Sequence, residues 1–583
     1  RNVYSHFDVQ RAGVILNNGN TNSQTQLAGW VQANANLAGG SARIILNEVT
    51  STNPSDLRGY TEVAGSKADV IIANPNGITC NGCGFINTSR GVLTTGTPVF
   101  GGDGSLSAFR VTGGNIAITG TGMVGTGADQ VDLIARAVQV NAELWAKTLN
   151  VITGANQVDY ATLATQTIAG SGAAPAVSID VAALGGMYAN KIRLVGTEAG
   201  VGVANAGNLV SAGDISITSA GRIVNFNTGT IGASGNTDFA ATGLTNSGSI
   251  DSRQNMNIAT TGDIQNAGLL TAGNNLQASA ASLDSTGTLA AGVRDDGTLG
   301  TSGNLSVTTT GALVATGTNA AGGDLALQGA SLDLRGADNS AGSDLTLTAS
   351  TGNIDHRGAR TSAGGRATLT AAADIDNRSS GSISARDITL VATGALVNEG
   401  STIEAGNTLA VTAASINNRS GRLANTGNGA STVSASGAID NTAGLIGGNG
   451  AVTLSAASID NSSGELTAAG RLEATTTGNL TNAAGKMSAG TSLDVVVGAR
   501  LDNTDGRIEA ETTAAIKADT LDNTRGRIAN AGTGTTSVEG TTRIINASGL
   551  IGGNGDLDIR GGAVENAAGA LVAGTVSATI QGH

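Results

Sequence analysis

The residues best suited to chemistry in this sequence are two cysteines, Cys80 and Cys83, separated by Asn-Gly. A zinc site would need two further ligands, but the three histidines, His6, His356 and His583, form no pair at ligand spacing. A redox-active dithiol would begin a helix beside a βαβ unit, and no such pattern surrounds these cysteines. A small disulfide ring that pins a loop, as in proteins of oxidising compartments, therefore fits best, and two free buried thiols are the alternative.

A second candidate is a series of aspartates, each directly before a repeated asparagine or, at Asp355, before His356, that could form a carboxylate row for calcium binding or sugar cleavage. Valine, asparagine, threonine or isoleucine replaces the aspartate in other copies, which favours a solvated face. Enzymes that cleave sugars need two or three carboxylates converging in one cleft, and calcium-binding repeats need the pattern G-G-x-G-x-D. We therefore expect no catalytic residue and no metal site. The aspartates are Asp355, Asp376, Asp440, Asp460, Asp502 and Asp522.

A short cadence organises the elements that carry these residues. From residue 396 on, an aliphatic residue, any residue and an asparagine return every 20 to 23 residues, and glycine usually follows three positions later. A fixed period of this size indicates one structural unit stacked many times. Fainter copies run back to Asn225. The asparagines of the clear copies are Asn398, Asn418, Asn441, Asn461, Asn482, Asn503, Asn523, Asn546 and Asn566.

The repeating unit is made of strands. Glycine accounts for 88 residues, and serine, threonine and asparagine separate single aliphatic residues, which argues against helical repeats. Short stretches with alternating polarity and glycine or asparagine at their ends are typical of strands. The sequence predicts an all-β fold, a right-handed parallel β-helix (solenoid) with coils of about 21 residues. We expect the asparagines to lie at inner corners, to adopt the left-handed conformation there, and to form a hydrogen-bonded ladder.

The first 240 residues have a different composition. All twelve aromatic residues lie between Tyr4 and Phe239. The segment Ala68–Ala73 is an almost continuous apolar run, which is typical of a strand buried on both faces. We therefore predict a capped N-terminal domain with extra-helical strands at 1–205 and a shaft of β-helical repeats at 206–583.

The net charge limits the kinds of partner, and the two ends of the sequence bear on the extent of the natural protein. The net charge is −13, which argues against a nucleic-acid partner, and no apolar run is long enough to span a membrane. The sequence begins with arginine and no leader precedes it, so we expect a removed signal or a domain truncated at its N-terminus. The repeat continues through His583 without a cap, and we expect the natural protein to continue as well.

Several segments of the early part resemble one family. These segments run from Ser5 to Asn18, from Tyr60 to Gly65, and from Ala73 to Thr88, the last reading ANPNGITCNGCGFINT. They resemble the N-terminal secretion domain of two-partner secretion exoproteins, the filamentous haemagglutinin class, and its contact-dependent growth-inhibition branch in particular. The resemblance covers about residues 1–205, and the later repeats are similar in style to the family's haemagglutinin repeats.

The resemblance implies a route and a partner. Members of this family pass from the periplasm of Gram-negative bacteria through an outer-membrane transporter, whose periplasmic domains recognise the secretion domain. One secretion motif of the family matches Asn74, Pro75, Asn76 and Gly77. The second appears as Asn34, Ala35, Asn36 and Leu37, with alanine in place of proline. These residues would either contact the transporter or form turns that let the domain fold.

The resemblance also implies a function. It predicts the secretion domain and filamentous shaft of a large surface-exposed exoprotein, serving as the stalk of a contact-dependent growth-inhibition toxin or as an adhesin. A target-cell receptor would be contacted through regions outside this chain, and no small-molecule cofactor is expected. The alternative is a β-helical polysaccharide-degrading enzyme.

Overall fold

The computed structural model describes residues 1–37 and 39–580, and this part of the chain contains strands and turns but no helix. His583, one of the histidines considered as a ligand, lies outside the described residues. Within the described ranges no helix is long and apolar enough to cross a membrane. The chain forms two compact units, Arg1–Gly303 and Asn304–His583. The predicted boundary between residues 205 and 206 falls inside the first unit and stays a prediction.

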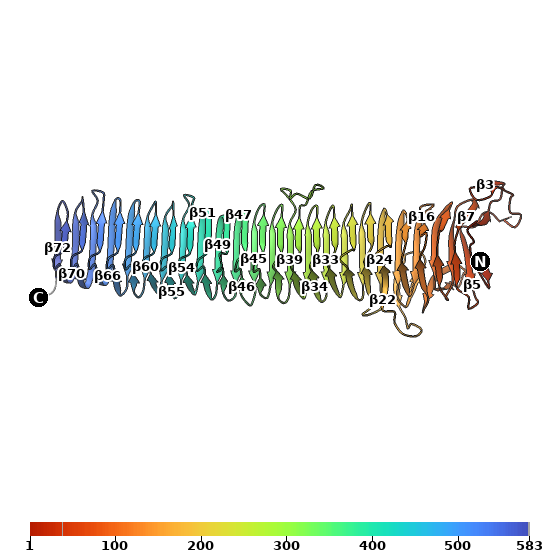
Figure 1. Ribbon diagram of the computed structural model, residues 1–583, viewed down its shortest axis with the longest axis horizontal. Helices are drawn as coiled ribbons and strands as arrows, with labels where there is room; N and C mark the ends of the chain where they lie inside the picture. The colour runs from red at the N-terminus through yellow and green to blue at the C-terminus, as the bar shows by residue number, and fades with distance from the viewer. Residues whose placement is uncertain (38, 581–583) are drawn as a thin grey trace. The chain divides into compact units, whose positions relative to one another are not determined.

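Each turn of the first unit consists of three short strands, such as β25 (Gly202–Asn205), β26 (Asn208–Ser211) and β27 (Ile215–Ser219). Each of these strands pairs in parallel with the equivalent strand one turn earlier and one turn later, so the turns build three parallel sheets. Figure 1 shows the strands stacked side by side in chain order. This arrangement confirms the predicted parallel β-helix. It satisfies the backbone groups of strands that are too short to be stable alone.

The sheet that contains β26 is termed the second face. Its strands are β2 (Val14–Asn18), β7 (Tyr60–Gly65), β10 (Cys83–Ile86), β15 (Met123–Val124), β18 (Glu143–Trp145), β23 (Gly186–Ala189), β26, β29 (Thr230–Ala233), β32 (Ser249–Ser252), β35 (Leu269–Ala272) and β38 (Thr288–Ala291).

Aliphatic side chains stack in register inside the coil. Ile223, Leu244 and Ile264 are Cα partners in successive turns, and all three are buried. Burying such a side chain contributes roughly 1.5–3 kcal/mol. Since a slip of one residue would move every aliphatic side chain to the outside, this pattern fixes the register of the stack.

Extra strands cover the outside of the third sheet of the first unit. The strands β12 (Thr97–Phe100), β13 (Leu106–Val111), β20 (Asn156–Asp159) and β21 (Thr165–Thr167) form an antiparallel sheet of four. Phe109 and Val158 of this sheet lie in one buried cluster with the outward-facing Ile71, Val92 and Ile134 of the coil. The run Ala68–Ala73, which forms β8, is therefore apolar on both sides because it is covered on both sides.

The second unit repeats the same three-stranded turn from β39 (Leu305–Thr309) to β72 (Val576–Ile580). In some turns two strands merge into a single long strand that continues around a corner. These long strands are β47 (Arg360–Ala371), β49 (Ser382–Ala392), β51 (Thr402–Ala413), β66 (Thr513–Asp522), β68 (Thr536–Ile545) and β70 (Leu557–Glu565). Register shifts at the bends, as between Ala363 and Arg366, allow one strand to serve two sheets.

Candidate secretion motifs and asparagine ladder

The first secretion motif forms a turn directly after β8. The backbone N–H of Asn76 donates to Oδ1 of Asn74 over 3.0 Å, and the N–H of Gly77 donates to the carbonyl of Asn74 over 3.1 Å. Gly77 has a φ of 113°, a left-handed conformation that glycine adopts without strain. Asn74 thus closes the turn with both its side chain and its carbonyl.

Asn74 also ties this turn to the preceding coil. Its Nδ2 donates to the carbonyl of Asn53 (2.9 Å) and to Oγ of Ser55 (3.0 Å), and the residue is fully buried. Pro75 and Asn76 are exposed at the tip. The motif therefore combines an inner residue that holds two coils together with an outer pair that solvent or a partner can reach.

The second motif forms the same turn although it lacks proline. The N–H of Asn36 donates to Oδ1 of Asn34 (3.0 Å), and the N–H of Leu37 donates to the carbonyl of Asn34 (3.1 Å). Nδ2 of Asn34 donates to the carbonyl of Asn17 at the edge of β2 (2.9 Å). Ala35 occupies the proline position, so the asparagine side chain suffices to close this turn.

The two motifs lie on different elements. Asn34 follows the hairpin strand β4 (Gly29–Val31), whereas Asn74 follows β8. In the described part of the chain no hydrogen bond joins the two turns. Asn34 and Leu37 line a pocket of about 340 Å³ beside β2. The two motif turns thus contact different residues, and together they do not form one site.

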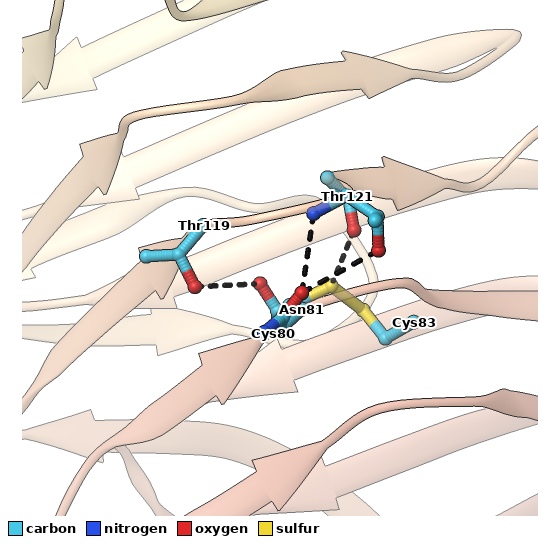
Figure 2. Close-up of a disulfide and its surroundings, with 6 residues drawn as sticks. Cys80, Asn81, Cys83, Thr119 and Thr121 are labelled. Carbon is cyan, nitrogen blue, oxygen red and sulfur yellow. Dashed lines mark hydrogen bonds between the residues drawn. A yellow bond between two sulfur atoms is a disulfide. The ribbon is translucent and has the colours of Figure 1, made fainter. Parts of the chain in front are cut away.

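A disulfide joins Cys80 and Cys83 at the corner between β9 (Ile78–Cys80) and β10 (Figure 2). Both cysteines are buried. Oδ1 of Asn81, between them, accepts a hydrogen bond from the backbone N–H of Thr121 in the next coil over 3.1 Å. The ring therefore fixes the corner and offers that coil an acceptor.

The repeated asparagines form a ladder in the interior of the second unit. From Asn398 to Asn546, Nδ2 of each asparagine donates to Oδ1 of the next over 2.7 Å. Nδ2 of Asn461, for example, donates to Asn482 in this way and also lies 3.1 Å from the carbonyl of Lys486 in the next coil. All are fully buried except Asn566, which is exposed. The first unit contains a shorter ladder through Asn205, Asn225, Asn246 and Asn266.

The expectation that the asparagines themselves adopt the left-handed conformation is wrong. The residue with positive φ lies two positions later, as at Ala443 (55°), Ser463 (54°) and Asp505 (56°). Asparagine is needed instead for its side-chain amide, which donates and accepts at once.

Glycine lies three positions after every asparagine of this ladder except Asn398, which is followed by Ser401, and steric contact explains this preference. A Cβ at Gly464 would lie 2.2 Å from the carbonyl oxygen of Asn441 in the preceding coil and 2.6 Å from Oδ1 of Asn461. Gly485 and Gly506 meet the equivalent atoms at similar distances. Only glycine lets successive coils approach this closely at the corner.

Sequence reasoning missed a detour of the ladder. In two turns the corner holds Ala315 or Leu334, and Asn319 and Asn339 occupy interior positions of the following strand instead. Nδ2 of Asn319 donates to Oδ1 of Asn339 over 2.9 Å. The signal was present in the sequence, because an asparagine stands where other turns have leucine or isoleucine, as Leu289 and Ile383 do.

His356 joins this detour to the main ladder. Nδ2 of Asn339 donates to Oγ1 of Thr361 (3.1 Å), Thr361 lies 2.6 Å from Nε2 of His356, and Nδ1 of His356 lies 2.7 Å from Oδ1 of Asn377. Since Oδ1 of Asn377 only accepts, Nδ1 of the neutral imidazole carries the proton and Nε2 accepts from Thr361. Burial lowers the pKa of His356 to about 4, which keeps the ring neutral.

The aspartates before the asparagines lie on the outer side of the coil and hold their own turns. Oδ1 of Asp460 accepts from the N–H and the hydroxyl of Ser462, at 2.9 and 2.6 Å. Arg357 pairs with Asp355 at 2.6 Å and reaches Asp376 at 3.7 Å. Within residues 1–37 and 39–580 no group of three or more histidine, cysteine, aspartate or glutamate side chains could hold a metal ion. The carboxylates therefore serve turns and ion pairs, and the polysaccharide-degrading alternative finds no support.

Comparison with known proteins agrees with this geometry. Residues 1–225 match the TPS secretion domain, and residues 232–299, 428–484, 475–533 and 531–582 match the haemagglutinin repeat. The tRNA nuclease CdiA-2 of Burkholderia pseudomallei (strain 1026b) is 53% identical over 225 residues, which are 38% of this chain and 7% of that protein. Toxin CdiA of Yersinia pestis is 51% identical over 272 residues, 46% of this chain and 8% of that protein. The crystal structure of the filamentous hemagglutinin secretion domain is 34% identical, with a TM-score of 0.40, and the match covers 44% of this chain and 88% of that chain.

A TPS secretion domain followed by haemagglutinin repeats on a parallel β-helix defines the class of two-partner secretion exoproteins. The chain belongs to the filamentous haemagglutinin and contact-dependent growth-inhibition family of that class, whose members are secreted to the cell surface or the extracellular space. A TPS domain implies an outer-membrane transporter as partner. The chain spans less than a tenth of the length of the two CdiA relatives, and the nuclease and toxin in their names describe those proteins.

Proposed function

We propose that residues 1–583 form the secretion domain and part of the shaft of a surface exoprotein, and that this segment supports and presents other parts of the protein without enzymatic activity of its own. The observation that carries the proposal is the continuity of the stack. The match to the TPS domain ends at residue 225 and the first repeat match begins at 232, yet the three-stranded turns run on through this junction.

The transporter's periplasmic domains are the proposed partner of the first 205 residues. Both turns are proposed to serve export. Their residues are Asn74, Pro75, Asn76 and Gly77 in the first motif and Asn34, Asn36 and Leu37 in the second. The burial of Asn74 favours a role in folding, whereas the exposure of Pro75 and Asn76 favours contact with the transporter. The names of the relatives favour the stalk of a contact-delivered toxin over an adhesin, with a target-cell receptor bound through regions outside this chain.

Export in a Gram-negative host that supplies the partner transporter tests this proposal. We expect Asn74→Ala to reduce the amount of secreted protein at least tenfold. Thr79→Ala, an exposed change on β9 close to the same turn, is the matched control and leaves secretion unchanged. Secretion of Asn74→Ala and Asn76→Ala at the control level would remove any role of this turn in export.

A further inference from the structure

The outer surface of the second face bears a cleft that the secretion function does not use. After β32 and β35 the chain turns the corner to the next sheet in three residues, 253–255 and 273–275. After β38 a longer loop, residues 292–303, replaces this short corner. Val293 and Leu299 form an antiparallel bridge that orders the loop. Insertions in regular repeats commonly lie on the binding face.

The loop and the outer surface of the sheet enclose a cleft of about 450 Å³. Outward-facing residues of three successive turns line it in register: Asp251, Thr271 and Ala290 are Cα partners, and Leu269 lies beside them. This volume lies within the range of small-molecule sites. The cleft is therefore built from a strand surface on one side and an inserted loop on the other.

Donors and acceptors alternate in the cleft. Oδ1 of Asp251 accepts from the hydroxyl of Thr271 over 2.7 Å, and Nη1 of Arg253 reaches Oδ2 of Asp295 on the loop over 3.2 Å. Arg294 also lines the cleft, so two arginines and two aspartates balance to no net charge. Leu269, 46% exposed, forms an apolar part of the floor.

This composition selects one chemical class of ligand. Balanced charge gives no net attraction for phosphate, sulfate or nucleic acid. Carboxylate and guanidinium side chains accept from and donate to neighbouring hydroxyl groups, and an exposed leucine can pack against the C–H face of a sugar ring.

The surface continues beyond the cleft along the same column of residues. Asp251 is followed toward the N-terminal end by Gly232, Val210 and Tyr188, one residue per turn. No atom lies within 4 Å of a Cβ built on Gly232, so the column has an open shelf there. Val210 is 40% exposed, and Tyr188 stacks on Trp145 with ring centroids 4.3 Å apart. From Asp251 to Tyr188 the shelf is roughly 14 Å long at one strand spacing per turn.

We propose that the cleft between Arg253, Asp251 and the loop 292–303 binds a neutral oligosaccharide, which extends over Gly232 toward Val210. This site is independent of the secretion motifs, and it can be tested on folded, purified protein whatever the outcome of the export experiment.

An array of neutral and sulfated oligosaccharides, probed with the chain 1–583, provides the test. We expect binding to at least one neutral oligosaccharide and a tenfold or greater loss of affinity for it in Gly232→Trp, which fills the open shelf. Asp251→Ala should give a similar loss of affinity. Because this outward-facing change is small, it tests the site even if Gly232→Trp fails to fold. Thr218→Trp, which places the same ring on exposed β27 in another sheet, is the matched control. The proposal is overturned if no neutral probe binds, if only sulfated probes bind, or if both variants bind like the control.

Discussion

At the scale of single residues, three positions of each corner have different duties. Asn461 contributes an amide that bonds to the next coil, Ser463 takes the left-handed conformation, and Gly464 leaves room for the carbonyl of the coil before. The repeated asparagine and glycine are visible in the sequence. The left-handed residue between them, two positions after the asparagine, is not, because its type varies. Since serine, alanine, aspartate and arginine all occur there, the backbone strain is accepted in exchange for the close stacking of coils.

Replacing one ladder asparagine should weaken the stack locally. In Asn482→Ala the buried Oδ1 of Asn503 loses the donor from Asn482, and Nδ2 of Asn461 loses one of its three acceptors. The hydrogen bonds from Asn482 to the carbonyls of Gly485 and Arg507 are lost as well. We expect the free energy of local opening to fall by about 3 kcal/mol, since each unsatisfied buried group costs roughly 1–3 kcal/mol. Hydrogen exchange in the coils on either side measures this, with Thr481→Ala as the control. Equal protection in the two variants would contradict the structural role of the ladder.

The two neighbouring positions of a corner should respond in opposite directions. Gly464→Ala places a Cβ against the carbonyl of Asn441 and should open the corner at a cost of about 3 kcal/mol or more. Ser463→Gly relieves a φ of 54° and should be neutral or stabilising by up to about 1 kcal/mol. Hydrogen exchange in the neighbouring coils measures both effects. A stabilising Gly464→Ala, or a strongly destabilising Ser463→Gly, would contradict the roles given to these two positions.

His356 should make the second unit sensitive to acid. Its pKa is about 4 in the folded chain against 6.5 for an ordinary histidine, so the unfolded chain binds the proton more readily. The contribution of neutral His356 to the free energy of unfolding is complete above pH 6.5 and is lost as the pH falls toward 4. The free energy of unfolding then decreases by about 3 kcal/mol. Burial lowers the pKa, and the hydrogen bond to Asn377 and the charge of Asp355, which both raise it, are included in this value. His356→Asn should lack this decline between pH 6.5 and 4 in thermal unfolding, and a decline as steep as that of the wild-type protein would show that other groups cause it.

At the scale of elements, the antiparallel sheet is attached to the coil by a buried polar network as well as by apolar contacts. Arg90 forms an ion pair with Asp132, which is fully buried, and its Nη1 donates to the carbonyl of Tyr160 over 2.6 Å. The ring of Tyr160 lies 4.6 Å from the guanidinium carbon of Arg90, and its hydroxyl donates to Asp69. Burial and the neighbouring carboxylate raise the pKa of Tyr160, so this hydroxyl keeps its proton.

Breaking this network should loosen the sheet. Arg90→Met leaves the charge of Asp132 buried without its partner, which costs about 3–5 kcal/mol. We expect faster proteolysis of the loop between β12 and β13. Arg58→Met, which removes an exposed pair with Asp56, serves as the control and should have little effect. Equal cleavage rates in the two variants would show that apolar packing alone holds the sheet.

Some elements could be predicted from the sequence and others could not. The parallel coil, its period and the doubly buried β8 were predictable because like residues recur at like positions, and each coil contacts only its neighbours. The assembly of β12, β13, β20 and β21 into one sheet was not predictable, because it depends on the pairing of β13 with β20, whose partner residues lie 45 or more positions apart without a repeat to reveal them. The detour through Asn319 and Thr361 was hidden for a related reason, since the polar residue moves from one strand to the next.

At the scale of the whole molecule, the ladder has a direction. In the described residues from Asn398 to Asn566 every ladder bond donates from the earlier coil to the later one. A folded coil therefore presents an unused donor to the coil that follows, and stacks of this kind fold by addition to an existing neighbour. We infer that folding proceeds from the N-terminal domain outward, which suits the export proposed above.

Pulse-labelling hydrogen exchange during refolding of the chain tests this account most directly. It predicts that amides of the N-terminal domain become protected first and that protection then advances in chain order toward residue 566. Protection that begins in the late repeats, or that arises in all coils at once, would contradict it.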